Sequence, residues 1–153
     1  MGYGEDRRCF AVGVFQDSLS AERGLDALRK KGFASESLSL LAKYTAETVA
    51  LAEKTFGVTS TQVEVSGLGA AVAHGELLCT LQGNDGGLGR NGVAATMDRA
   101  GFQSHDGFIY ETLTARGGIL VAIDSEPRAA DALAILHCYG GGNAAIGAWA
   151  GRV

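Results

Sequence analysis

Gly117-Gly118-Ile119-Leu120-Val121-Ala122-Ile123-Asp124 places five consecutive apolar residues between a glycine pair and an acidic residue. A short apolar run without polar alternation predicts a strand that is buried on both faces, in the interior of a sheet. A second apolar run, at residues 9–15, predicts another central strand near the opposite end of the chain. The fold can be developed outward from these two runs.

Each apolar run is followed by a segment in which apolar residues recur at helical spacing, and the two segments resemble one another. A shift of 108 positions superimposes residues 12–15 on 120–123 and matches four residues of the two helices. These pairs are Ala21 with Ala129, Leu25 with Leu133, Leu28 with Leu136, and Gly32 with Gly140. The similarity indicates an internal repeat, although two amphipathic helices could also share it by chance.

The repeat predicts two related βαβ-type halves, at residues 9–42 and 117–149, within one domain that spans residues 1–153. The first half ends in a half-buried strand at 37–41, and the second ends in a short strand at 144–149. Two such halves predict an α+β fold of the ferredoxin-like type, an antiparallel sheet with its two most apolar strands side by side in the centre. Both repeat helices would cover one face. The other face would need a cover, either from a partner sheet or from the segment between the halves.

That segment, residues 43–116, predicts a partly helical insertion that is rich in glycine and alanine. Helical spacing and β-branched composition assign part of it, whereas residues 67–92 show no clear period and stay unassigned. The assigned elements are helices at 46–56 and 93–100, a short strand at 59–65, and a further helix capped by Ser104 in which Phe108, Ile109 and Leu113 face inward.

The composition argues against a polyanionic partner. The 153 residues carry a formal net charge of -4, which disfavours nucleic acid and anionic membranes. The basic run Arg29-Lys30-Lys31 predicts solvated surface. Three widely spaced cysteines form no disulfide pattern, and the first residues do not have the form of a signal peptide. No apolar run approaches the ~18 residues of a membrane span, so we expect a cytoplasmic protein.

Several stretches form a recognisable pattern when they are taken together. They are residues 11–15, 21–23 and 27–33 in the first half, the small-residue stretch 65–75, and then residues 92–102, the pair Tyr110-Glu111 and residues 117–123. Over residues 9–139 they resemble the bacterial general stress protein 17M-like, heat-induced stress protein domain family. This resemblance implies a stress-linked role. It transfers no catalytic residue, because the family is characterised by its expression under stress rather than by a defined reaction.

The chain departs from this family in its insert. Family members usually carry an apolar, glycine-zipper-like insert with a suspected membrane link. The corresponding segment here contains ionisable and amide side chains, and burying each of them in lipid would cost several kcal/mol. We therefore expect no membrane insertion. The side chains are His74, Glu76, Gln82, Asn84, Asp85, Arg90 and Asn91.

Residues 87–92, Gly-Leu-Gly-Arg-Asn-Gly, match the G-x-G-x-x-G pattern of phosphate-binding loops. Backbone N–H groups at such a turn can bind an anion where a helix begins. A dinucleotide-binding fold also needs a strand that runs directly into the first glycine, and residues 83–86 intervene here. A plain turn before a helix is the alternative interpretation. The candidate anion-binding residues of this loop are Gly87, Gly89, Arg90 and Gly92.

The remaining reactive side chains form no catalytic or metal-binding pattern. The histidine and cysteine spacings include no zinc motif, and the pair of His74 and Cys79 lacks a third, orienting group. We therefore predict no catalytic residue, no metal and no cofactor. His74, Tyr110 and Glu111 are candidates for lining a ligand pocket. For Tyr110-Glu111, packing is the favoured interpretation, with the ring beneath the sheet and the carboxylate on a loop backbone.

Three functions are compatible with these features. The favoured hypothesis is a non-enzymatic, stress-associated protein that forms homo-oligomers. The second is a small-ligand-binding regulatory or sensor module, whose ligand the sequence does not identify. The third is a nucleotide- or phosphate-binding enzyme that uses the loop at 83–92.

Overall fold

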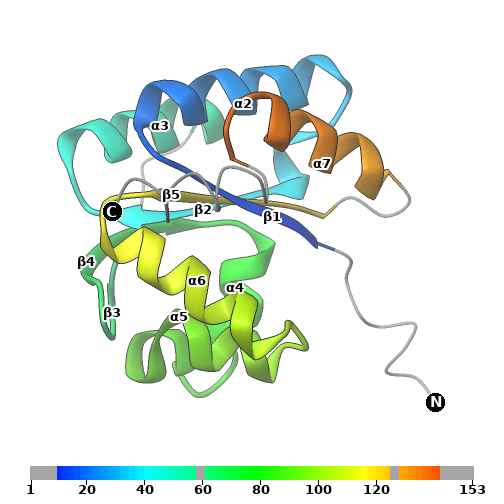
Figure 1. Ribbon diagram of the computed structural model, residues 1–153. Helices are drawn as coiled ribbons and strands as arrows, with labels where there is room; N and C mark the ends of the chain where they lie inside the picture. The colour runs from blue at the N-terminus through cyan, green and yellow to red at the C-terminus, as the bar shows by residue number, and fades with distance from the viewer. Residues whose placement is uncertain (1–9, 58–60, 125–127, 142–153) are drawn as a thin grey trace.

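The computed structural model describes residues 10–57, 61–124 and 128–141. Its centre is a five-stranded sheet with the order β1-β5-β2-β4-β3, in which every neighbouring pair is antiparallel (Figure 1). The strands are β1 (Phe10–Phe15), β2 (Leu38–Lys43), β3 (Thr61–Val65), β4 (Gly69–His74) and β5 (Ile119–Asp124). The predicted α+β class with an antiparallel sheet is confirmed.

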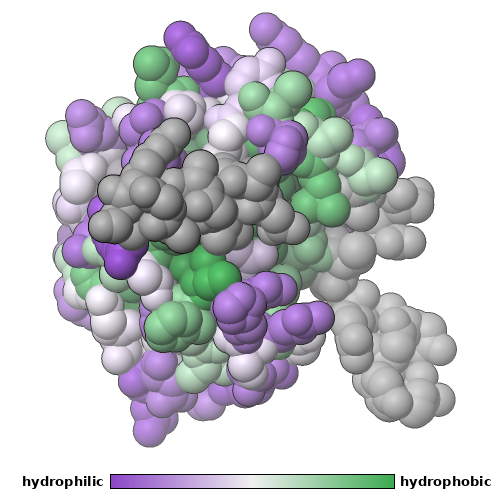
Figure 2. Space-filling model, viewed as in Figure 1, coloured by the Kyte–Doolittle hydropathy of each residue, from purple (hydrophilic) through white to green (hydrophobic). Residues whose placement is uncertain are grey.

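Helices cover both faces of this sheet (Figure 1). One face carries α2 (Ser18–Lys30), α3 (Ala46–Phe56) and α7 (Ala129–Cys138), and the other carries α4 (Glu76–Gln82), α5 (Gly87–Arg99) and α6 (Ser104–Ala115). A 3-10 turn, η1 (Ser35–Ser37), precedes β2. Each face packs into its own apolar cluster, with Phe15 in the first and Tyr110 in the second. The sheet is therefore the middle of three layers, and some apolar surface remains visible over α6 and near α7 (Figure 2).

The two apolar runs lie side by side, as predicted. β5 lies between β1 and β2 and is antiparallel to both, pairing Ala122 with Val12 and Val121 with Leu40. β1 and β2 are therefore parallel, and α2 connects them in a split β-α-β unit. The prediction that both runs are central is wrong for the described strands, because β1 ends the described sheet on its side. Residues 144–149, the predicted final strand, lie outside the described residues.

The internal repeat is preserved where α2 and α7 end. Gly32 and Gly140 have φ values of 95° and 90°, a conformation that glycine adopts without strain. Each donates its N–H to the carbonyl three residues earlier. The following residue, Phe33 or Gly141, donates to the carbonyl five residues earlier. Both helices thus end in the same Schellman motif at equivalent positions of the repeat.

The repeat is less regular on the buried sides of the two helices. Leu25 of α2 is 1% exposed, whereas Leu133 of α7, its counterpart, is 42% exposed. Leu133 therefore does not occupy the core position that its counterpart Leu25 occupies. α7 packs instead through Ala132, Ile135 and Leu136.

The insertion supplies the cover of the second face. β3 and β4 form a hairpin that extends the sheet beyond β2, and α4, α5 and α6 then pack beneath the sheet. Because both faces are covered, β2 is buried from Leu38 to Ala42. The strand predicted at 37–41 is therefore present, but the prediction that it is half-buried is wrong. The helix predicted at 46–56 coincides with α3, and the predicted strand at 59–65 contains β3.

Two predicted details of α6 are wrong. The helix begins after Gln103, and Ser104 is already its first residue, so the Ser104 hydroxyl bonds the Asp98 carboxylate at 2.7 Å instead of capping the helix. Phe108 is 64% exposed, whereas Leu113 is buried. Five residues of helix separate these two side chains by about 140° around the axis, so they cannot both face the sheet.

The insertion helices are short. α4, α5 and α6 contain 7, 13 and 12 residues. Within the ranges that the structure describes, no helix is long and apolar enough to cross a bilayer. Polar side chains of the insert such as Glu76 and Arg90 are exposed.

Candidate functional site

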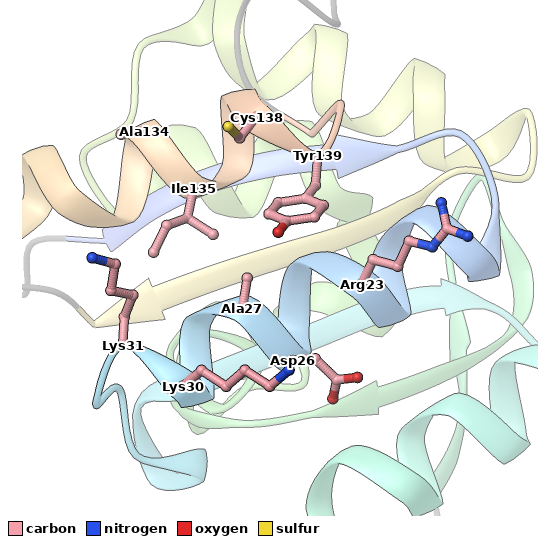
Figure 3. Close-up of a pocket in the computed structure, with 9 residues that line it drawn as sticks. All are labelled: Arg23, Asp26, Ala27, Lys30, Lys31, Ala134, Ile135, Cys138 and Tyr139. Carbon is pink, nitrogen blue, oxygen red and sulfur yellow. The ribbon is translucent and has the colours of Figure 1, made fainter.

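A groove between α2 and α7 is the candidate binding site. It has a volume of about 870 Å³ and lies on the side of these helices that faces away from the sheet core (Figure 3). The two helices, with the C-cap residue of each, provide the nine lining residues. These are Arg23, Asp26, Ala27, Lys30 and Lys31 on one side, and Ala134, Ile135, Cys138 and Tyr139 on the other.

The sequence of α2 presents its charged residues to this groove because the rest of the helix is fixed in the core. The carboxylate of Asp17 caps the helix by accepting from the Ser20 N–H at 2.7 Å. Ala21, Leu25 and Leu28 are buried, and the 3.6-residue period then places the polar residues on the remaining side. The orientation of the cations thus follows from the amphipathic pattern.

The groove is positively charged. Arg23, Lys30 and Lys31 contribute three cations, and the described part of the chain gives none of these side chains an ion-pair partner. The single acidic residue of the lining, Asp26, is already bound by Arg29 at 2.6 Å. The local field therefore favours an anion.

An apolar wall completes the groove. Ala27, Ala134 and Ile135 line its middle, and the Tyr139 ring lies between the two helices (Figure 3). Tyr139 is 41% exposed, so a ligand could cover its face. Cys138 is also exposed. Cations beside an apolar wall can hold a compound that is both anionic and partly apolar.

The groove contains neither a histidine nor a free carboxylate. Its one carboxylate, on Asp26, is held by Arg29. The Cys138 thiol thus has no imidazole or free carboxylate beside it among the nine lining residues. The cations and the apolar wall provide the contacts of a binding site.

A second, smaller pocket brings together two residues that the sequence analysis considered as a pair. His74 and Cys79 both line a cavity of about 530 Å³ near the junction of β4 and α4, together with Glu36 and Glu76. The His74 ring stacks on Phe56, with their centroids 4.0 Å apart. No metal-binding cluster of histidine, cysteine and acidic side chains is present among the described residues.

The G-x-G-x-x-G loop is part of α5, which bends at Gly92. The N–H groups of Gly87 and Gly89 donate to the side chains of Asp85 at 3.1 Å and Gln82 at 2.9 Å. Arg90 is exposed, and its guanidinium bonds the Asp85 carbonyl at 3.4 Å. The backbone donors of these two glycines thus already have acceptors within the chain.

The second half of α5 is capped from another helix. Gly92 has φ 92° and ψ −179°, so the helix restarts at Val93. The Val93 and Ala94 N–H groups donate to one oxygen of Glu111, at 3.0 and 3.3 Å. An anionic side chain of α6 therefore occupies the position at which a phosphate would meet these amides.

The structure separates the three residues that were candidates for lining a pocket. His74 lies in the smaller pocket, Glu111 caps α5, and Tyr110 is 7% exposed within the apolar cluster beneath the sheet. Burial raises the pKa of Tyr110 to about 12. The Tyr110 ring is packed as predicted, whereas the Glu111 carboxylate accepts from backbone N–H groups of helix α5 rather than of a loop.

The groove residues were not among the candidates selected from the sequence. Lys30 and Lys31 were interpreted as part of a solvated basic run, and Arg23 was not selected at all. One signal was present, because Arg23 and Lys30 are seven residues apart and so lie on the same side of a helix. The sequence does not show that α7 lies beside them.

Comparisons with known proteins add no assignment. The chain matches no family model, and no curated protein or solved structure is significantly similar to it. The function must therefore be argued from the residues and geometry of the site.

Proposed function

We propose that the chain is a non-enzymatic binding protein whose α2–α7 groove takes a small anionic ligand. The observation that carries this proposal is a set of three cations along an apolar wall, none of which forms an ion pair with another described residue. Cations that make no internal ion pair are free to neutralise a ligand, and the wall can bury its apolar part. The proposal corresponds to the regulatory or sensor module among the hypotheses from the sequence.

The wider setting of this function is also a proposal. The resemblance of residues 9–139 to the general stress protein 17M-like, heat-induced family supports a stress-associated role in the bacterial cytoplasm. We also propose self-association, with the exposed side chains of Phe108, Leu19 and Leu133, at 64%, 56% and 42%, as candidate contacts with a second copy. Light scattering at micromolar concentration tests whether the chain self-associates, and a monomeric mass would contradict this proposal.

An enzyme that uses the loop at 83–92 is less well supported. The Gly87 and Gly89 N–H groups are satisfied by side chains, and those of Val93 and Ala94 are satisfied by Glu111. A phosphate would have to displace these internal acceptors, two of which, the carboxylates of Asp85 and Glu111, are charged. For that reason the groove, rather than the loop, is the site that we propose.

Thermal unfolding with a panel of anionic, neutral and cationic metabolites tests the proposal. A ligand at 100 times its Kd stabilises the folded state by about 2.7 kcal/mol. For a chain of this size that corresponds to a rise in Tm of about 5–10 °C. We expect such a rise with at least one anionic compound and none with its neutral analogue.

Two matched double variants locate the effect. Lys30→Gln with Lys31→Gln removes two charges from the groove, whereas Arg90→Gln with Arg116→Gln removes two exposed charges on the other side of the sheet. The first pair should abolish most of the ligand-induced shift, and the second should preserve it. Equal shifts in both variants, or no response to any anion, would refute the proposed site.

A further inference from the structure

We infer that the α2–α7 groove selects linear molecules that carry an anionic group at each end and an apolar middle, such as α,ω-dicarboxylates. This inference rests on the proposed function, because it specifies the ligand class of the same groove. The inference depends on the positions of the cations along the groove and not only on their number.

The cations stand at the two ends of the groove. Arg23 and Lys31 are eight residues apart on α2 and its C-cap, which corresponds to about 12 Å along the helix axis. Figure 3 shows Arg23 toward one end and Lys31 toward the other, with Ala27 and Ile135 between them. A compact anion could therefore contact one end but not both.

The middle of the groove is unsuited to an anion. Ala27, Ala134 and Ile135 provide apolar surface there, and they offer no donor to a charged group. Asp26 lies between Arg23 and Lys31 in the sequence, and its carboxylate, which Arg29 binds, offers only acceptor oxygens and no donor to an anion. An uncharged chain between two terminal anions satisfies both conditions, with the Tyr139 ring beside it.

The test is a calorimetric series with succinate, adipate, sebacate and dodecanedioate, and with decanoate as the singly charged control for sebacate. We expect affinity to rise with length toward sebacate and dodecanedioate, because only these reach both ends. Decanoate should bind about five-fold more weakly than sebacate, which is the factor expected for one exposed ion pair.

Two substitutions and the alkylation of two cysteine thiols test where the ligand binds. Arg23→Gln should remove the preference for sebacate over decanoate, whereas Arg116→Gln, on the other side of the sheet, should retain it. Bound sebacate should also slow alkylation of Cys138, which lines the groove, and leave alkylation of Cys79 unchanged, as mass spectrometry of the peptides would record.

The outcomes separate this inference from the proposed function. Equal affinities for sebacate and decanoate, or a preference that survives Arg23→Gln, would overturn the two-ended ligand while a groove for anions still stands. The two-ended ligand would also be overturned if none of these carboxylates binds, while another anion raises Tm and loses this effect when Lys30 and Lys31 are replaced. If no anion binds at all, both proposals fail.

Discussion

Replacing Glu111 with alanine tests whether the carboxylate of α6 holds the second half of α5 in place. One Glu111 oxygen accepts from the Val93 and Ala94 N–H groups at 3.0 and 3.3 Å. Loss of a helix cap typically costs about 1 kcal/mol, and loss of a negative charge at a helix N-terminus costs about 0.3–1 kcal/mol more. We therefore expect Glu111→Ala to lower the free energy of unfolding by about 2 kcal/mol, or Tm by roughly 4–8 °C.

Urea denaturation followed by circular dichroism measures this loss. Glu111→Gln keeps an oxygen acceptor but loses the charge, so it should lose about half as much stability. Glu53→Ala is the matched control, because Glu53 is an exposed glutamate near the end of α3, and it should change stability by less than about 0.5 kcal/mol. If Glu111→Ala is no more destabilising than Glu53→Ala, the capping argument is wrong.

Three further predictions follow from packing and burial. Leu28→Ala should lower the free energy of unfolding, measured by urea denaturation, by about 2–5 kcal/mol because Leu28 is fully buried. Leu133→Ala, at the exposed repeat position, should lower it by less than about 0.5 kcal/mol. Equal losses in the two variants would contradict the described orientation of α7. Gly24→Ala should lower the free energy of unfolding by about 1–3 kcal/mol, because a Cβ there would lie 2.6 Å from the Phe15 ring. Unchanged thermal stability would contradict this contact. The pKa of Tyr110 is raised to about 12, so unfolded chains lose this proton first and stability should fall as pH rises from about 10 to 12. Tyrosinate absorbance should show a tyrosine that ionises only at high pH. Tyr110→Phe should remove this late titration and also the part of the stability loss that Tyr110 causes.

The strands and the ends of the repeat helices could be predicted because local sequence determines them. Uninterrupted apolar runs lead to β1 and β5, and both runs remain strands because each is long enough to be buried but too short for a helix. Gly32 and Gly140 end α2 and α7 for a local reason as well, since the positive φ that each adopts favours glycine.

The segment at 67–92 could not be assigned because its structure depends on distant contacts. β4 has the sequence Gly-Ala-Ala-Val-Ala-His, and alanine and glycine have little intrinsic preference for strands. The strand forms where Val72 pairs with Ala42 of β2 on one side and with Gln62 of β3 on the other. Neither pairing leaves a periodic signal within the segment.

The candidate site was missed for a related reason. The cations of α2 have the ordinary pattern of a solvated helix face, and their spacing is visible in the sequence. What makes them a site is the position of Ile135 and Tyr139 on α7, more than a hundred residues later in the chain. Glu111, in contrast, was predicted to accept from backbone N–H groups, and it does so at Val93 and Ala94 of α5.

The insertion of β5 between β1 and β2 has a consequence for synthesis on the ribosome. The stretch from Lys43 to Ile119 separates β2 from β5, and at about 5–20 residues per second it takes on the order of 4–15 s to translate. During that time the nascent chain has made β1 and β2 but not β5, the strand that lies between them in the sheet. Ribosome-bound chains that stop before residue 119 should therefore recruit chaperones, and the sheet can close only after β5 has emerged from the exit tunnel.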